Sequence, residues 1–325
     1  MNHATPIHIV TVTPNPAIDR TIEVDRLRPG HVHRVLSDQT HIGGKGNNVA
    51  SLLSVPRNRG DTKIAATGFL GKENAALFEE HYKKHSTANH CVGVMGETRT
   101  NIKVIEAQSR QTTDLNASGF HVDEHDVKQL FTTLDQLAQD AAANSWIVLA
   151  GSLPTGCPTT FYRDAVALIK SHNCNVLLDT SSEALRLGIQ SAPTVIKPNA
   201  AEASELAGIN ITDGDSAKHA AQAIQQIANI RTIIISLGEQ GALFFHNGIA
   251  FVATPPPLTP ASTVGAGDAM VAGFIASQLL EHDLRTAAAN ATAFSAGKLM
   301  RIEMRLPPQA QIEAMATQVD VRELK

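Results

Sequence analysis

Short apolar runs, each followed by a segment with helical periodicity, limit the fold of this chain more than any other feature. The runs include HIVTVT (8–13), KIAATGFLG (63–71), WIVLAG (146–151), NVLLD (175–179), TVIKPN (194–199) and TIIISLG (232–238). Continuously apolar strands are buried on both faces, and helical crossovers between them make the sheet parallel. The pattern predicts an α/β fold with a mostly parallel central sheet between helices. Ligands bind such sheets at the carboxyl ends of the strands.

Two β-rich regions interrupt this alternation. Residues 21–27 and 33–42 show broken apolar and polar alternation, and residues 91–116 are β-like again. We expect both regions to pair in one small, half-exposed sheet. No repeat or low-complexity linker separates it from the rest. The predicted organisation is a core of 1–16, 43–90 and 119–325, with a β-lid of 17–42 and 91–118. A hairpin over 241–254 and a mainly helical last seventy residues complete the core.

Composition excludes several classes of function. The 325 residues contain 27 basic and 31 acidic side chains, a net charge of −4, and no basic run of the kind that binds nucleic acid. Three widely spaced cysteines indicate neither a disulfide framework nor a zinc site. The apolar runs are too short to cross a bilayer, and no secretory segment is recognisable, so we expect a cytoplasmic protein with no membrane partner.

The segment TVGAGD (263–268) opens an apolar helix after a proline-rich run. Glycines at 265 and 267 let backbone amides approach an anion at the positive end of a helix, with the Asp268 carboxylate beside it. A glycine turn with Asp268 as a simple cap is the alternative for this segment alone. The Walker sequence GxxxxGK[ST] is absent, and GAGDAM lacks the third glycine of GxGxxG.

Seven segments together resemble a known family. TVGAGD, GGKGNNVA, PNPAID, GETRTN, GSLPTG, KPNAAE and SLGEQGAL, in their order and spacing, are similar to the ribokinase-like sugar kinases of the PfkB family over roughly residues 8–305. PNPAID, the lysine of GGKG, and GETRTN followed by TTDLNASG most resemble its 1-phosphofructokinase and tagatose-6-phosphate kinase branch. The resemblance implies a ribokinase-like three-layer α/β/α core with a small β-sheet lid.

The resemblance also implies roles for individual residues. Asp268 would be the general base, and the amides of Gly265, Ala266 and Gly267 would stabilise the transferred phosphoryl group. The residues expected at the sugar or its phosphate are Asp19, Gly44, Lys45, Asn48, Arg99, Asn101 and Ser152. Each motif alone also has a structural explanation, such as a turn aspartate, a solvated lysine or a solvent-facing arginine. Asn47 departs from the apolar residue usual at its position in such kinases.

The resemblance also implies which residues bind ATP and its metal ion. Lys197 would reach the phosphates of ATP, and Ser236, Gly238 and Gly241 would hold its triphosphate and ribose. Asn199 and Glu202 lie one helical turn apart and would orient Mg²⁺ through water, although a helix cap would explain them nearly as well. Asp179 is a weaker candidate for the outer shell of the metal. A monovalent cation is a further expectation.

The implied reaction is ATP-dependent phosphorylation of a sugar phosphate, foremost of fructose 1-phosphate at its 6-hydroxyl to give fructose 1,6-bisphosphate. Tagatose 6-phosphate and fructose 6-phosphate are alternative acceptors with the same mechanism. A non-catalytic sugar-phosphate sensor is the alternative of a different class, but Asp268 and Glu202 are both retained. In the kinases that this chain resembles, the lid often joins its counterpart in a second subunit, which covers exposed sheet edges. The resemblance therefore implies a homodimer.

Overall fold

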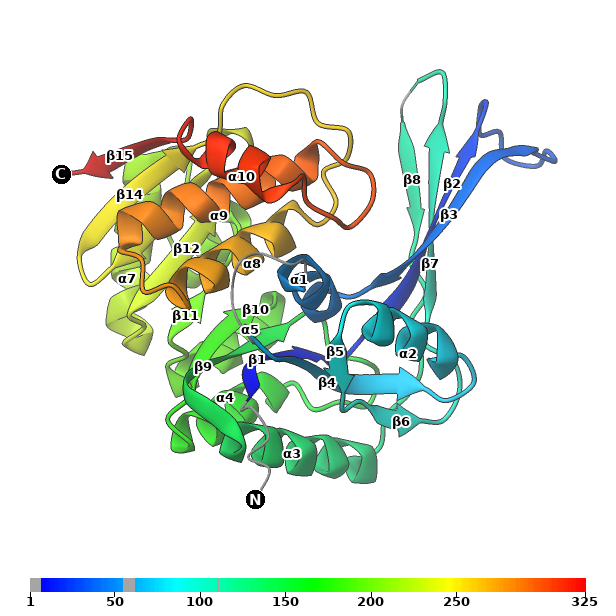
Figure 1. Ribbon diagram of the computed structural model, residues 1–325, viewed down its shortest axis with the longest axis horizontal. Helices are drawn as coiled ribbons and strands as arrows, with labels where there is room; N and C mark the ends of the chain where they lie inside the picture. The colour runs from blue at the N-terminus through cyan, green and yellow to red at the C-terminus, as the bar shows by residue number, and fades with distance from the viewer. Residues whose placement is uncertain (1–6, 55–61, 110) are drawn as a thin grey trace.

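The computed structural model describes residues 7–54, 62–109 and 111–325, and these form the predicted α/β fold (Figure 1). Within the described residues the main sheet has eleven strands. In sheet order they are β15 (Asp320–Leu324), β14 (Ile249–Thr254), β13 (Ala242–His246), β12 (Thr232–Ser236), β11 (Val195–Ile196), β10 (Asn175–Asp179), β9 (Ala141–Ala150), β1 (Ile7–Thr13), β4 (Ile64–Gly71) and β5 (Thr87–Asn89), with β6 (Val92–Val94) also paired to β4. The strands from β12 to β5 run parallel, and β13, β14 and β15 join them antiparallel.

Helices cover both faces of this sheet, which confirms the three-layer prediction. Successive strand residues point to opposite faces, so Val10 packs in one core and Ile9 in the other. One layer contains α3 (Glu124–Gln139), α4 (Phe161–Ser171), α5 (Ser182–Gly188), α6 (Ala200–Ala207) and α7 (Gly214–Ala228). The other contains α1 (Lys45–Leu53), α8 (Ala266–Gln278), α9 (Leu284–Leu299) and α10 (Gln309–Ala316), while α2 (Ala75–Lys84) packs in a smaller cluster beside them.

In the described part of the chain the second sheet has four strands, and it projects from the main body in Figure 1. β2 (Ala17–Val24) lies antiparallel to β3 (Val35–Gly43) and parallel to β7 (Thr100–Glu106), and β8 (Thr112–Leu115) closes the other edge. Apolar side chains on both edge strands are exposed, with 60% of Leu36 and 56% of Leu115 open to solvent. This sheet therefore leaves apolar surface uncovered in a single chain.

Three elements differ from the sequence-based expectation. The expected pairing of residues 91–116 with 21–42 is wrong at its start, because β6 extends the main sheet beside β4 with Phe69 opposite Val92. β11 contains only two residues of the expected 194–199, since its continuation at Pro198 has no N–H for a ladder. The terminal strand β15 was not expected; it pairs with β14 and buries Val321 and Leu324. Among the described helices, none is long and apolar enough to cross a membrane.

Candidate active site

Several of the predicted site residues follow the carboxyl ends of parallel strands, as expected for this kind of sheet. β9 leads to Ser152, β10 ends at Asp179, β11 leads to Lys197 and Asn199, and β12 ends at Ser236. Because neighbouring parallel strands end at the same edge, these side chains meet although they are far apart in the sequence. The amino-terminal end of α8 reaches the same edge from the helix layer, and it brings Asp268.

The start of α8 has the geometry of an anion site. Gly265 is the residue before the helix and has a φ of 78°, which favours glycine. No side chain caps the first turn, whose amides have no partners within an α-helix. A β-carbon at Gly267 would lie 3.3 Å from the Nζ atom of Lys197. A side chain there would crowd this ammonium group, so Gly267 lets Lys197 lie close to the first turn of α8.

Asp268 lies in the first turn of α8 with only 7% of its surface exposed. Its Oδ2 atom accepts a hydrogen bond of 2.7 Å from Nδ2 of Asn48 on α1. Burial raises the pKa of Asp268 to about 6, and the negative charge of Asp179 adds to the increase; Asn48 and two nearby lysines oppose it. The carboxylate is thus a stronger base than an exposed aspartate while it remains mostly ionised at neutral pH.

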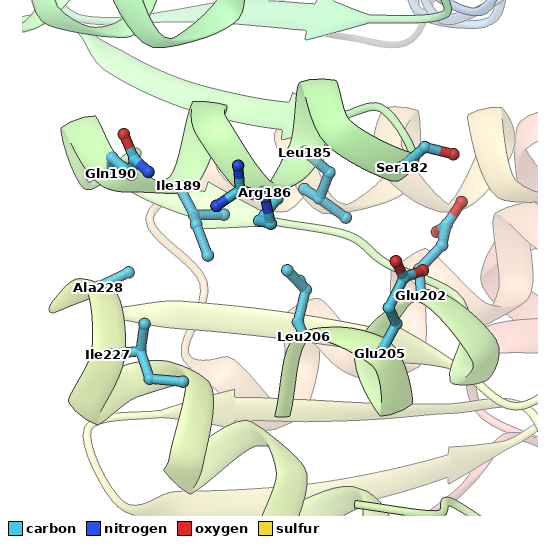
Figure 2. Close-up of a pocket in the computed structure, with 10 residues that line it drawn as sticks. All are labelled: Ser182, Leu185, Arg186, Ile189, Gln190, Glu202, Glu205, Leu206, Ile227 and Ala228. Atoms are coloured by element: carbon cyan, nitrogen blue, oxygen red, sulfur yellow. The ribbon is translucent and has the colours of Figure 1, made fainter. Parts of the chain in front are cut away.

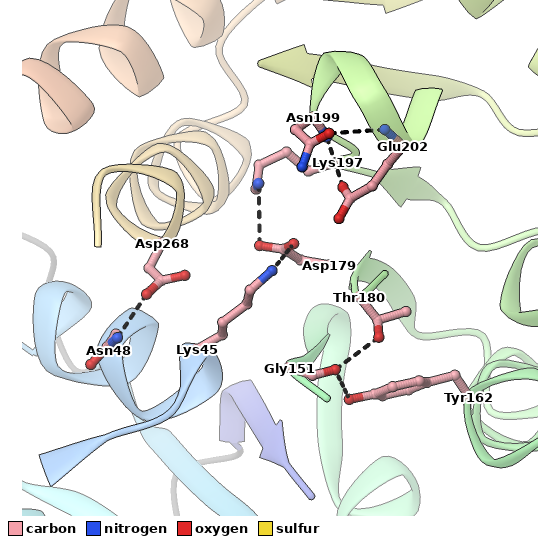
Figure 3. A network of polar contacts seen from close by, with 10 residues as sticks. All are labelled: Lys45, Asn48, Gly151, Tyr162, Asp179, Thr180, Lys197, Asn199, Glu202 and Asp268. Carbon is pink, nitrogen blue, oxygen red and sulfur yellow. Dashed lines mark hydrogen bonds and ion pairs between the residues drawn. The ribbon is translucent and has the colours of Figure 1, made fainter. Parts of the chain in front are cut away.

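Asp179 joins two lysines at the centre of the site (Figure 3). One oxygen accepts from Lys45 Nζ at 2.8 Å, and the other lies 3.3 Å from Lys197 Nζ. Burial alone would raise the pKa of Asp179, but the two ammonium groups outweigh it and hold the pKa below its usual value. Sequence reasoning ranked Asp179 low because nothing in NVLLD indicates that lysines from two distant segments converge on it.

The charges in this cluster favour an anionic ligand. The side chain of Lys45 is 40% exposed, whereas that of Lys197 is 7% exposed. The Lys197 amine lies beside Gly267 in the first turn of α8, and the Lys45 amine, bonded to the other oxygen of Asp179, belongs to the more exposed side chain. A phosphate group at this point would meet two cations and a helix terminus, which is a chemically consistent phosphate site.

Polar groups of the small sheet form a second part of the site. His41, Asp19 and Asn101 lie opposite one another on β3, β2 and β7, and Asn101 Nδ2 donates to Asp19 Oδ1 at 3.0 Å. A β-carbon at Gly43 would clash with the Asp19 carboxylate, so a side chain at this position would displace it. Burial raises the pKa of Asp19, partly offset by the hydrogen bond from Asn101. Nε2 of His41 and Oδ1 of Asn101 are buried without a partner among the described residues.

Asn15 is a site residue that the motif comparison missed. It is buried after β1, and its Nδ2 atom donates to Oγ of Ser152 at 3.2 Å, while its Oδ1 atom is buried without a partner among the described residues. Arg99 lies next to it and donates to the main-chain carbonyls of Asn15, Pro16 and Ala117. Its guanidinium group thus ties the second sheet to the site and has further N–H groups available. Asn15 lies between the two prolines of PNPAID, a pattern that indicates a turn and gives no sign of a buried amide.

Asn199 and Glu202 form a capping box at the start of α6. Glu202 N–H donates to Asn199 Oδ1 at 2.9 Å, and Asn199 N–H donates to Glu202 Oε2 at 2.8 Å. The cap alternative raised from the sequence is therefore correct for these atoms, and only one of the two Glu202 carboxylate oxygens takes part in it. Among the described residues, no group of three or more His, Cys, Asp or Glu side chains could hold a metal ion.

The remaining expected nucleotide residues separate into two kinds. Ser236 forms a bridge with Asn199, so the ends of β11 and β12 lie side by side. Gly238 is exposed, has a φ of 63°, and has open space where a β-carbon would be. Gly241 instead lies where a β-carbon would come within 2.0 Å of the Ala253 carbonyl oxygen. Close packing against Ala253 is therefore enough to explain the glycine at position 241, without any ligand.

Asn47, the departure from the usual apolar residue, is fully buried and paired. Its Oδ1 atom accepts from the Tyr82 hydroxyl at 2.8 Å, and its Nδ2 atom donates to the Gly43 carbonyl at 3.0 Å. Gly44 has a φ of 103° and lies next to this bond, before Lys45 and α1. Asn47 therefore holds the GGKG turn to α2 through Tyr82, and the local packing is intact.

One cavity lies near the carboxyl edge of the main sheet, and another lies at its amino-terminal edge. A mainly apolar cavity of about 200 Å³ lies between α5, α6 and α7, and Glu202 and Ser182 line its side nearest the site (Figure 2). A larger cavity of about 580 Å³ lies at the amino-terminal ends of the strands, beside Trp146, Asn175 and Thr232. Neither contains the polar cluster of Asp179, Lys45 and Asp268, which lies at the carboxyl edge.

Comparison with known proteins agrees with this geometry. The model of the pfkB family carbohydrate kinases matches residues 12–307. A 1-phosphofructokinase from Rhodobacter capsulatus is 38% identical over 318 residues, covering 98% of both chains. One from Xanthomonas campestris is 39% identical over 320 residues, covering 96% of this chain and 98% of that protein.

Solved structures give the same fold. Phosphofructokinase-2 from Escherichia coli in complex with potassium has a TM-score of 0.86 at 23% identity, covering 96% of this chain and 99% of that one. A tetrameric inhibited form of the same protein has a TM-score of 0.85. With the family model and the near full-length relatives, the chain belongs to the pfkB family of carbohydrate kinases.

Proposed function

We propose that this kinase is an ATP-dependent 1-phosphofructokinase, which converts fructose 1-phosphate to fructose 1,6-bisphosphate. The observation that carries the proposal is the convergence of the buried Asp268 carboxylate, the uncapped start of α8, and the ammonium groups of Lys45 and Lys197. Near full-length identity to curated 1-phosphofructokinases supports this acceptor within the family.

In the proposed mechanism Asp268 accepts the proton of the attacking sugar hydroxyl. The hydrogen bond from Asn48 fixes one carboxylate oxygen and leaves the other to face the substrate. Phosphoryl transfer proceeds through a loose transition state, so positioning supplies most of the rate and the proton leaves late. A carboxylate with a pKa of about 6 is sufficient for this task.

The amides of Gly265, Ala266 and Gly267 would stabilise the negative charge of the group in transfer. Lys197 is held beside Gly267, so its ammonium group and the helix terminus would act on the same phosphoryl oxygens. The exposed end of Lys45 would contact either this group or the phosphate of the sugar. Asp179 fixes both amines before the substrates arrive.

ATP and Mg²⁺ are the proposed nucleotide and metal. Ser236, Gly238 and the end of β11 form the surface for the nucleotide phosphates and ribose, with open space at Gly238. The free oxygen of Glu202 and the Asn199 amide are hard oxygen donors, which fit a magnesium ion held through water. Bound there, the ion would neutralise charge on the phosphates of ATP.

The proposed sugar site is the row of polar groups on the second sheet. Asp19 would accept hydrogen bonds from sugar hydroxyls, and Oδ1 of Asn101 and Nε2 of His41, which have no partner among the described residues, are further groups for a polyhydroxylated ligand. Buried polar atoms without partners are costly, so a polar ligand at this place is physically consistent. Arg99 and Ser152 would hold the phosphate of the acceptor.

The test is ADP release with Mg-ATP and a panel of acceptors. We expect the highest kcat/KM with fructose 1-phosphate, compared with fructose 6-phosphate, tagatose 6-phosphate and unphosphorylated sugars. A preference for tagatose 6-phosphate or fructose 6-phosphate would keep the mechanism and change the acceptor. No turnover with any of them, together with measurable binding of a sugar phosphate, would support the sensor alternative.

The second sheet is proposed as a substrate cover and as the interface of a homodimer. The proposed boundaries are 17–42 and 91–118 for this lid, around a core of 1–16, 43–90 and 119–325, except that residues 92–94 pair with β4 of the main sheet. Residues 1–6, 55–61 and 110 lie outside the described ones. Exposed Leu36 and Leu115 on its edge strands support an interface between two copies.

A further inference from the structure

Lys298 is the most deeply buried charged residue among those described, with 0% of its surface exposed. Lysine is almost never fully buried unless its ammonium group is paired. Burial lowers the pKa of Lys298, and the negative charges of Asp268 and Glu303 partly restore it. No sequence motif includes this lysine, and the proposed mechanism does not use it.

The surroundings of Lys298 place it behind the start of α8. Its Nζ atom donates to the Arg301 carbonyl at 3.0 Å. A β-carbon at Gly265 would lie 3.4 Å from Cε of Lys298 and 2.4 Å from Cε of Met304. The next residue, Leu299, accepts hydrogen bonds from the N–H groups of Ala261 and Ser262 in the segment that leads into α8. The end of α9 and the following loop therefore support the turn that presents the anion site.

A lysine in the last turn of a helix is often only a cap for the final carbonyl groups. A lysine in the last turn of a helix can bond a nearby carbonyl from the surface, as Lys170 of α4 does, whose exposed amine donates to the Ala192 carbonyl at 2.6 Å. Full burial of Lys298 adds a desolvation cost that a cap does not require. Two interactions of the ammonium group offset this cost: its hydrogen bond to the Arg301 carbonyl and its attraction to the negative charge of Asp268.

We propose that Lys298 acts as a permanently attached monovalent cation that holds the loop 299–305 against the start of α8 and adds positive charge behind the phosphoryl group. It is a positioning residue, since its side chain lies behind Gly265 and bonds the Arg301 carbonyl rather than the substrate. This inference rests on the proposed kinase function. It also answers the expectation of a monovalent cation, because the chain supplies that charge itself and the activity does not need K⁺.

The first experiment compares Lys298→Ala with the wild-type protein and with Lys170→Ala as the matched control. We expect kcat of Lys298→Ala to fall by about tenfold or more, with KM for the sugar phosphate nearly unchanged, as for loss of a charge that acts at a helix terminus. KCl or NH4Cl should restore much of the loss, since either ion can occupy the space left by an ammonium group. Choline chloride at equal ionic strength should not, because choline is too large.

The wild-type protein and Lys170→Ala should be equally active in KCl and choline chloride. A wild-type enzyme that requires K⁺ would overturn the proposal. So would a Lys298→Ala variant with wild-type kcat and only reduced thermal stability, or one whose lost activity no small cation restores. Lys298→Arg, which keeps the charge, should retain more activity than Lys298→Met, which keeps most of the volume.

Two further measurements separate this inference from the proposed reaction. The melting temperature of Lys298→Ala should rise in KCl relative to choline chloride, whereas that of the wild-type protein should not; this result does not depend on the acceptor. If no acceptor is phosphorylated, the proposed function fails while this comparison still tests Lys298.

The pH dependence of kcat should also change. Asp268 faces Lys45 from α1, Asp179 from β10, Lys197 after β11 and Lys298 from α9. Removing one of the three cations should move the acidic limb of the kcat profile to higher pH, because the Asp268 carboxylate then loses a favourable charge. A purely structural role for Lys298 would leave this limb in place.

Discussion

Asp268 links function to a cost in stability. Its carboxylate is buried, and the pKa of about 6 means that the folded state disfavours the ionised form relative to the unfolded chain. Protonated Asp268 therefore contributes to the stability of the folded state. This contribution is complete at pH values below the pKa of Asp268 in the unfolded chain and is lost as the pH rises through its folded-state pKa of about 6. At neutral pH the ionised base therefore reduces the free energy of unfolding.

Asp268→Asn tests both parts of this argument. We expect kcat to fall by about three orders of magnitude, since a general base contributes roughly 10²–10⁴ and the amide cannot accept the proton. KM for ATP should change little, because the amides at the start of α8 remain. The melting temperature at pH 7.5 should be equal to or higher than that of the wild-type protein. Near wild-type turnover would remove Asp268 from the mechanism.

The same pKa predicts the pH dependence of the wild-type enzyme. Only ionised Asp268 accepts a proton, so kcat should rise with pH through about 6 and reach a plateau above neutrality. The measurement is kcat from pH 5 to 8 at saturating substrates, with the coupling enzymes in excess at each pH. A profile that stays flat down to pH 5 would mean that chemistry does not limit turnover or that another group is the base.

Residues that lie in motifs could be predicted from the sequence, whereas residues whose role depends on contacts made by the fold could not. Asp268, Asn48 and Lys197 are brought together as the motifs implied. Asp179 was ranked low and Lys298 was not considered, because their importance comes from residues more than a hundred positions away or from complete burial. Neither property is visible in a local pattern.

At the scale of elements, the capping box of α6 has two explanations that one pair of variants separates. Asn199→Ala should cost about 1 kcal/mol of stability by loss of the cap. Asp213→Ala is the matched control, since Asp213 and Ser216 form the same box at the start of α7, on the surface. If Asn199 also orients Mg²⁺, only Asn199→Ala should raise the Mg²⁺ concentration needed for half-maximal activity. Equal Mg²⁺ dependence in both variants would leave Asn199 as a cap alone.

Element prediction succeeded where one physical signal dominated. The buried strands β1, β4, β10 and β12 are continuous apolar runs, and their existence and direction followed from the sequence. The short strands β5 and β6 contain three residues each, too few to show a period. β15 shows no clear alternation, since its buried residues Val321 and Leu324 are three positions apart, and its place depends on the free edge of β14, which only the assembled sheet provides.

At the scale of the whole molecule, the chain combines a closed core with a sheet that is incomplete alone. Helices cover both faces of the main sheet, whereas the second sheet exposes Val35 and Leu36 on β3 and Leu115 on β8. The same sheet carries Asp19 and Asn101, which are bonded to each other and belong to the proposed sugar site. Anything that covers its exposed side would therefore also restrain these proposed sugar-binding residues. Assembly and substrate affinity should be coupled for this reason.

This coupling predicts that lysines introduced on the edge strand β3 separate the subunits and, at the same time, lower the affinity for the sugar phosphate. For Val35→Lys with Leu36→Lys we expect the mass from light scattering to fall from two copies to one, because buried apolar contacts are replaced by repulsive charge. KM for the sugar phosphate should rise several-fold while KM for ATP stays constant. Ile249→Lys is the control, since Ile249 is also half exposed on a strand but lies on β14 of the main sheet. A wild-type protein that is monomeric at micromolar concentration, or a double variant that remains dimeric, would assign the exposed residues of β3 to a role other than self-association.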